Sequence, residues 1–284
     1  MTQLEFEIWD VFTDRPFAGN PLAVVTGADD LSTAQMQTLA RQFNLSETIF
    51  LMAPRDPAHT ARARIFFPTA EIPFAGHPTV GAALLLAGRD GLDRVVLEEE
   101  AGLVPVEIDG AAATFDAPVL PARAGAADAA EVAEAVSLEP GDVAGPCEAW
   151  SGGPCFLFVP VASREALARA AAREFALTSV LRRLGATGAY LHDPDGNARM
   201  FAPQDGIPED PATGSASAIL AGPLLAAGRL AEGVTERTLV QGEDMGRRSE
   251  IGLAAEVRDG ALVRVRITGR AVPVMAGRTR VPPA

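Results

Sequence analysis

The chain has 284 residues, of which 48% are hydrophobic and 21% charged, and its formal net charge is -13. This composition excludes disordered, collagen-like and coiled-coil proteins, and the length suggests about two domains. The negative charge argues against nucleic acid or an anionic membrane as a partner, because phosphate groups are bound through Lys and Arg. All 24 basic residues are arginine, which excludes a lysine Schiff base and a P-loop lysine.

Two further features predict a cytoplasmic protein without a membrane segment. No window approaches the roughly 18 to 20 apolar residues of a bilayer span, and the start, MTQLEFEIWDVF, does not resemble a signal peptide. Cys147 and Cys155 have neither CxxC nor Cys/His metal spacing. Two cysteines cannot form a disulfide framework for a chain of this length, so a reducing compartment is expected.

In chain order, the first half is expected to run strand, helix, strand, strand, long helix and strands. Residues 79–87 are the core of the long apolar helix, and residues 94–110 are strand-like and close on an Asp-Gly turn. Residues 117–132, rich in Ala, Pro and Gly, read as a linker leading into a helix. The same order of elements then follows again, with a strand at residues 156–161.

An internal repeat explains this order. The segment 63–73, ARIFFPTAEIP, aligns without gaps on 198–208, ARMFAPQDGIP, with six identities in eleven positions. The match continues from 75–89 to 213–229, in each case a glycine-containing turn that enters an Ala/Leu-rich helix. We therefore predict an α+β fold of two pseudo-symmetric lobes, residues 1–118 and 119–284, with a tail after about residue 270 that packs back on the first lobe. Each sheet is expected to wrap around its apolar helix, which has few polar positions.

The two helix starts are the candidate binding elements. Gly76 and Gly214 each lie where unpaired backbone N–H groups and the helix dipole favour an anion, and a cleft between duplicated lobes is a natural ligand site. An acidic protein needs such local donors to hold a small carboxylate. The alternative is that both starts are plain helix caps.

Glu47 is the candidate acid/base group. Its counterpart in the repeat alignment is Thr187, so a single lobe carries a carboxylate at this mostly apolar strand position. A carboxyl between Leu45, Ile49 and Phe50 would be partly desolvated, which suits it to proton transfer. The alternative is a turn with an outward-facing glutamate.

His77 and Asp210 are further candidates. His77 stands beside Gly76 at a helix start and is either a ligand-facing group or a hydrogen-bonded structural one. Asp210 either binds a polar substrate group or forms an Asp-Pro turn. His59 and His192 fall in polar, loop-like stretches, and the three histidines show no metal-ligand spacing, so no metal is expected.

Five segments together resemble the PhzF-like isomerase/epimerase family of phenazine biosynthesis. They are DVFTDRPFAGNPLAVV (10–25), NLSETIF (44–50), FAGHPTVGAA (74–83), EDPATGSA (209–216) and QGEDMGRRSEI (241–251). The resemblance spans nearly the whole chain. It implies the diaminopimelate-epimerase-like fold, a homodimer and no cofactor.

The same resemblance implies roles for particular residues. Glu47 matches the family's catalytic glutamate, and His77 and Asp210 match further catalytic positions. The substrate contacts would come from Ser46, Gly76, Gly214 and Ser215. The expected reaction is a cofactor-independent proton shift within a small carboxylate-bearing substrate, carried out in the cleft between the lobes.

Two other functions are compatible with the fold, and one residue differs from the family pattern. The first alternative is a non-catalytic small-molecule binding protein on the same fold. The second is a two-cysteine racemase, which the sequence disfavours because the matching positions lie near Ala75 and Pro211 rather than at a cysteine. The departure is Arg248, where the family more often has proline.

Overall fold

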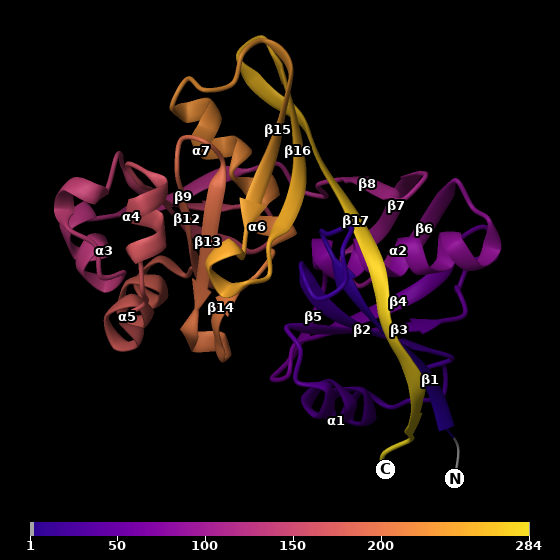
Figure 1. The fold of residues 1–284 in the computed structure, drawn as a ribbon. Helices are drawn as coiled ribbons and strands as arrows, with labels where there is room; N and C mark the ends of the chain where they lie inside the picture. Colours follow the sequence, from indigo (N-terminus) through magenta and orange to yellow (C-terminus); the bar gives the residue numbers. More distant parts are fainter. Residues whose placement is uncertain (1–2, 284) are drawn as a thin grey trace. The chain divides into compact units, whose positions relative to one another are not determined.

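The structure, a computed structural model, describes residues 3–283 (Figure 1). They form two compact α+β units. One unit runs to Asp116 and takes the chain up again at Thr268, and the other is Ala117–Ile267. The division predicted from the sequence lies at residue 118, and the predicted return of the tail lies at about residue 270.

The first unit is a mostly antiparallel sheet with two helices. Its elements are β1 (Gln3–Val11), β2 (Asn20–Thr26), α1 (Thr33–Phe43), β3 (Glu47–Met52), β4 (Ala61–Phe66), β5 (Glu71–Ile72), α2 (Gly76–Asp90), β6 (Arg94–Glu99), β7 (Gly102–Asp109), β8 (Ala112–Asp116) and the later part of β17 (Ala261–Arg280).

The strands of this unit close into a ring around α2. Pairing runs β1–β2–β3–β4–β6–β7–β8–β17 and returns to β1. The pairs β2–β3 and β4–β6 are parallel, and β1–β2, β3–β4, β6–β7, β7–β8 and β17–β1 are antiparallel. Helix α2 contacts β1, β2, β3, β6, β7 and β8, and eleven of its residues are buried. The predicted helix is therefore confirmed and longer than its apolar core, and the sheet wraps around it as expected.

The second unit contains more helix but a similar sheet. Its elements are β9 (Ala122–Ala127), α3 (Ala129–Ala135), η1 (Pro140–Asp142), β10 (Cys147–Ser151), β11 (Cys155–Pro160), α4 (Arg164–Arg169), α5 (Glu174–Leu184), β12 (Gly188–His192), β13 (Asn197–Ala202), η2 (Pro203–Asp205), β14 (Ile207–Asp210), α6 (Gly214–Ile219), α7 (Ala221–Ala226), β15 (Gly233–Gln241), η3 (Glu243–Met245), β16 (Ser249–Arg258) and the start of β17.

Strand pairing repeats between the units. The series β1–β2–β3–β4–β6–β7 has the same alternation of antiparallel and parallel pairs as β10–β11–β12–β13–β15–β16, and β5 pairs with β4 as β14 pairs with β13. As predicted, Asp109-Gly110 closes β7 and Asp259-Gly260 follows β16. Asp259 and Gly260 both have positive φ, as a tight hairpin turn requires. The duplication is therefore structural.

The register corrects one residue of the repeat alignment. Thr48 pairs with Phe66, and in the second unit Ala189 pairs with Phe201. Because Phe66 and Phe201 are equivalent in the repeat, the counterpart of Glu47 is Gly188 rather than Thr187. A Cβ at Gly188 would lie 2.9 Å from the carbonyl oxygen of Phe201, so this position has no room for a side chain.

Two predicted elements differ in the second unit. Residues 122–127 of the expected linker form β9, which pairs with β10 although its Ala/Gly composition carries no strand signal. The second apolar helix is divided into α6 and α7. Pro223 causes this division, because proline lacks an N–H and its ring clashes with the carbonyl four residues earlier, at Ile219.

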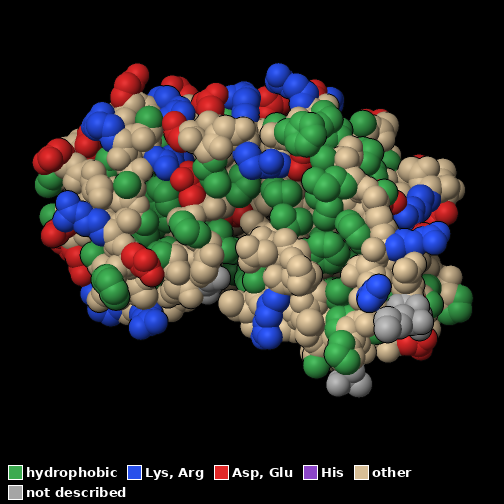
Figure 2. Space-filling view, turned by 60° about the horizontal axis from the view of Figure 1, so that its bottom comes forward, with side chains coloured by type: hydrophobic (Ala, Val, Ile, Leu, Met, Phe, Trp, Pro, Cys, Tyr) green, Lys and Arg blue, Asp and Glu red, His purple; other side chains and the backbone are tan. Residues whose placement is uncertain are grey.

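Acidic and arginine side chains are interspersed on the face seen in Figure 2, which shows no continuous basic surface. This distribution agrees with the net charge of -13. Within residues 3–283, no helix is long and apolar enough to cross a membrane.

The close packing at Gly188 leads to a prediction with a matched control. Gly188→Ala is expected to lower the free energy of unfolding by about 1–3 kcal/mol, because the added methyl group overpacks the sheet. Gly88→Ala, in α2, places its methyl group in open space and is expected to raise stability by up to about 1 kcal/mol. Urea denaturation of both variants measures the two effects. Equal stability of the two variants would contradict the assigned register.

Candidate active site

Glu47 and His77 meet inside the first unit. Glu47 opens β3 and His77 is the second residue of α2, and Glu47 Oε2 lies 2.8 Å from His77 Nδ1. The side chains are 12% and 2% exposed, so the outward-facing alternative for Glu47 is wrong. The pair is close but not aligned for a hydrogen bond: Glu47 Oε2 and both ring nitrogens of His77 have no partner of hydrogen-bond geometry among the described residues. Buried polar atoms in this state are rare and call for an explanation.

The start of α2 carries no side-chain cap. The residue before it is Ala75, whose side chain cannot accept a hydrogen bond, and Pro78 in the first turn has no N–H to satisfy. In contrast, Ser32, Asp128 and Ser163 cap α1, α3 and α4 through side-chain oxygens. Among the described residues, the backbone N–H groups of Gly76 and His77 are thus open donors at a positive helix end.

The buried side chain of Glu99 contacts the first turn of α2 through Thr79. Thr79 Oγ1 lies 2.8 Å from the carbonyl oxygen of Ala75 and 2.7 Å from Glu99 Oε1. A hydroxyl has one proton, and the carbonyl oxygen can only accept, so a second bond at Thr79 requires that Glu99 donates. Burial also raises the pKa of Glu99 to about 8. Glu99 is therefore a neutral carboxylic acid at pH 7 that anchors the residue preceding Gly76.

Asp210 belongs to a buried network in the second unit. Thr213 Oγ1 donates to Asp210 Oδ2 at 2.6 Å, and Gln241 Nε2 donates to the Asp210 carbonyl oxygen at 2.7 Å. Gln241 Oε1 also accepts from the Thr213 N–H at 3.1 Å. Thr213 precedes α6 but its hydroxyl is directed to Asp210, so α6 also begins without a side-chain cap.

Gln241 was not among the predicted site residues, although it lies in the segment 241–251 that resembles the family. This fully buried amide links the Asp210 turn to the end of β15. Gly214 and Ser215 are the first residues of α6. The described geometry therefore groups Ser46, Glu47, Gly76 and His77 in one unit, and Asp210, Gly214 and Ser215 in the other.

The remaining histidines lie apart from this site. His59 Nδ1 contacts Glu98 Oε1 at 2.8 Å, and the backbone N–H of Asp56, with His59, lowers the pKa of Glu98 to about 2. The placement of His192 in a loop was wrong: it ends β12 and is buried, which lowers its pKa to about 4. Within the described part of the chain, no group of His, Cys, Asp and Glu could hold a metal ion.

Both thiols lie in the second unit and are poor nucleophiles. Burial, reinforced by the charge of Asp128, raises the pKa of Cys147 to about 12. Burial also raises the pKa of Cys155. Arg248 forms exposed ion pairs with Glu243 and Glu250, at 3.1 Å each, and these account for its side chain without a substrate.

Comparisons with known proteins cover almost the whole chain. Residues 9–277 match the model of the family described as phenazine biosynthesis-like protein. A protein of Mesorhizobium japonicum named an uncharacterized isomerase is 38% identical, with 98% of this chain and 99% of that protein covered. The trans-2,3-dihydro-3-hydroxyanthranilate isomerase of Pseudomonas chlororaphis is 35% identical, with 94% and 96% covered.

Solved structures support the fold. A predicted epimerase from Pseudomonas aeruginosa has a TM-score of 0.84 at 34% identity, with 97% of this chain and 99% of that chain covered. A hydroxyproline epimerase from Agrobacterium vitis has a TM-score of 0.63 at 14% identity, with 97% and 92% covered, a likeness of fold alone. These neighbours confirm the expected diaminopimelate-epimerase-like fold.

The neutral state of Glu99 predicts how stability depends on pH. Its pKa is raised from 4.5 in the unfolded chain to about 8 in the fold, so the folded state binds more protons between these values. This contribution to stability is fully present below pH 4.5 and is lost as the pH rises to about 8. Glu99→Gln, which keeps a donor to Thr79, is expected to remove this loss.

Thermal denaturation at pH 5, 6.5 and 8 measures the effect. The melting temperature of Glu99→Gln minus that of the wild type is expected to increase from pH 5 to 6.5 and again from pH 6.5 to 8. Glu100→Gln, on the exposed neighbouring residue, is the control and should follow the wild type. Parallel pH profiles for the wild type and Glu99→Gln would show that Glu99 is ionised in the fold.

Proposed function

Because the chain belongs to the phenazine biosynthesis-like family and is an isomerase, we propose that it moves a proton within a small carboxylate-bearing substrate by general acid/base catalysis, without a cofactor. The observation that carries the proposal is the largely buried Glu47–His77 pair beside an uncapped helix start. Among the described residues, Glu47 Oε2 and both ring nitrogens of His77 lack aligned partners. A bound substrate would supply partners to these atoms.

Glu47 is the proposed base and acid. Its carboxylate takes a proton from a carbon next to a double bond or a carboxyl group, and the electron pair of that C–H bond moves into the substrate's π system. The protonated Glu47 then returns the proton to another atom of the same substrate. The shift is redox-neutral, so the balanced reaction requires no oxidant, reductant or other co-reactant.

His77 is proposed to position and polarise the substrate from its contact with Glu47, 2.8 Å away. The open N–H groups at the start of α2, with Gly76 leaving the backbone accessible, would hold the substrate carboxylate. Ser46 precedes Glu47 and would contribute a further contact. The low exposure of this pair would exclude water and protect the transferred proton.

The proposal assigns Asp210, Gly214 and Ser215 to the same substrate. What supports this assignment is the preorganisation of the turn, since Thr213 and Gln241 fix Asp210 and the hydroxyl of Thr213 does not cap α6. If both groups act on one substrate, the effects of Glu47→Gln and Asp210→Asn on kcat/KM should be strongly non-additive.

The substrate of the named relatives, trans-2,3-dihydro-3-hydroxyanthranilate, is the first probe. In heavy water, NMR follows the incorporation of deuterium at the atom that receives the proton as the double bond shifts. Glu47→Gln is expected to lower kcat by about 10²–10⁴-fold, the usual contribution of a positioned acid/base group.

The control is Glu100→Gln, which should retain the wild-type rate. Wild-type exchange by Glu47→Gln would show that another group transfers the proton. If the probe is inert with the wild type, a library of cyclic and unsaturated acids is tested by the same exchange, and the comparison of variants is made on the acid that exchanges.

A two-thiol mechanism predicts that alkylation of the cysteines abolishes activity, whereas the carboxylate mechanism predicts little effect. Because the pKa values of both thiols are raised and neither adjoins α2 or the start of α6 in the sequence, iodoacetamide is expected to leave the exchange rate within about twofold of the untreated enzyme. Mass spectrometry counts the modified cysteines. A loss of activity in proportion to labelling would contradict the carboxylate mechanism.

A further inference from the structure

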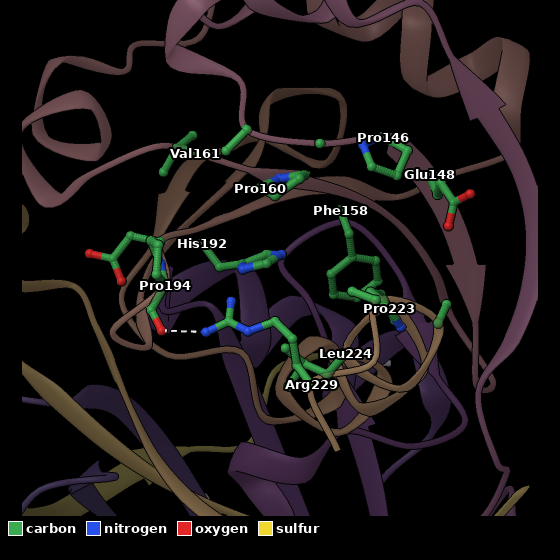
Figure 3. Close-up of a pocket in the computed structure, with 15 residues that line it drawn as sticks. Pro146, Glu148, Phe158, Pro160, Val161, His192, Pro194, Pro223, Leu224 and Arg229 are labelled. Carbon is green, nitrogen blue, oxygen red and sulfur yellow. Dashed lines mark hydrogen bonds between the residues drawn. The ribbon is translucent and has the colours of Figure 1, made fainter. Parts of the chain in front are cut away.

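The second unit contains a cavity of about 470 Å³ that the proposed reaction does not use. It lies between β11, the turn after β12 and α7 (Figure 3). Its floor is buried and consists of Phe158, Val161, His192 and Leu224, and exposed residues such as Ala227 form its rim. This volume lies within the range of about 300–1,000 Å³ that is typical of small-molecule sites.

Arg229 is the arginine that lines this cavity. Its guanidinium donates to the carbonyl oxygen of Pro194 at 2.7 Å (Figure 3), and among residues 3–283 no carboxylate lies within ion-pair distance of it. One Nη donor engaged with a neutral carbonyl leaves the other donors of the fork for a ligand.

The carboxylates near the cavity are already engaged. Glu148, which lines it, pairs with Arg123 at 2.7 Å and accepts from Trp150 Nε1 at 3.0 Å. Asp193 accepts from the backbone N–H groups of Asp195 and Asn197, at 2.9 Å each, and from the Asn197 side chain. Asp193 keeps its negative charge, but its oxygens are engaged with these neutral donors and it forms no ion pair with Arg229, so the guanidinium retains N–H donors for a ligand.

His192 adds a neutral polar group to the floor. Its ring extends into the cavity between Pro160 and Arg229, toward Phe158 (Figure 3). Burial, together with the charge of Arg229, lowers its pKa, while contacts with Asp193 oppose the shift. A neutral imidazole can exchange a hydrogen bond with a ligand without adding charge.

We propose that this cavity is a second ligand site, for a small organic anion whose carboxylate pairs with Arg229 and whose apolar body packs on Phe158, Pro160 and Leu224. Arginine binds carboxylates through two parallel N–H donors, which fixes the orientation of the ligand as well as its charge. The apolar walls select for a hydrophobic body. None of the residues that line this cavity belongs to the proposed catalytic set, so the site stands independently of the proposed function.

The probes are 2-naphthoate and its neutral isostere 2-naphthamide, tested on the full chain. Calorimetry gives the affinity, and ¹⁵N-histidine NMR gives the location, because the chain has only three histidines. We expect 2-naphthoate to bind, to perturb His192 and to raise the pKa of His192, since a bound carboxylate offsets the charge of Arg229. 2-Naphthamide is expected to bind more weakly by about tenfold or more.

Variants test the two parts of the site. Arg229→Met is expected to weaken 2-naphthoate binding by roughly ten- to hundredfold, and Arg229→Lys to restore part of it. Ala227→Trp places a large ring on the exposed rim and is expected to block the cavity, whereas Ala168→Trp, exposed on α4, is the matched control. Glu47→Gln should bind the probe as the wild type does.

Several results would overturn the site. They are the absence of 2-naphthoate binding, a perturbation of His77 in place of His192, equal affinity for acid and amide, and unchanged binding by Arg229→Met. Sedimentation at the NMR concentration provides a further check. Self-association that Ala227→Trp abolishes, in the absence of probe, would assign the cavity to a second copy of the chain instead.

Discussion

Helix α2 is enclosed by strands of its own unit, so every polar group near its start must be satisfied by the protein or by a ligand. Burying such a group without a partner costs several kcal/mol in an apolar environment, about 1–3 kcal/mol by protein mutation. The chain satisfies Thr79 with a neutral Glu99 and the Ala75 carbonyl. Among the described residues, it leaves Glu47 Oε2 and both ring nitrogens of His77 without aligned partners, and also the second oxygen of Glu99, Oε2. The two pairs differ in that Thr79 and Glu99 are joined by a hydrogen bond, whereas Glu47 and His77 are not.

The equivalent position of the central helix has a different hydrogen-bond partner in each of the two units. In one unit the fourth residue of the central helix, Thr79, meets a carboxylic acid, and in the other the equivalent Ser217 lies 3.2 Å from the hydroxyl of Tyr190. Glu47 has Gly188 as its counterpart, where close packing leaves no space for a side chain. A carboxylate in a single unit is therefore maintained by steric constraint as well as by residue choice.

Net charge explains why local donors matter in this protein. A charge of -13 repels carboxylate ligands at long range, so an anion must be held by groups within direct contact. Among the described residues, candidates of two kinds are present. One is the uncapped backbone of α2, and the other is Arg229, which lacks an acidic partner while arginines such as Arg199 and Arg64 are bonded to glutamate through two N–H groups each.

Local patterns in the sequence determined the repeat, the α+β class, the apolar helix at residues 79–87 and the Asp-Gly turns, because each depends on neighbouring residues or on direct self-similarity. The sequence also singled out Glu47 and His77 as candidates. Their contact, the protonation of Glu99 by way of Thr79 and the role of Gln241 were decided by tertiary structure, since the partners lie from 20 to 31 residues apart. The strand β9 and the counterpart of Glu47 likewise depended on strand pairing, which joins backbones regardless of side-chain pattern and shifts by single residues that an ungapped alignment does not detect.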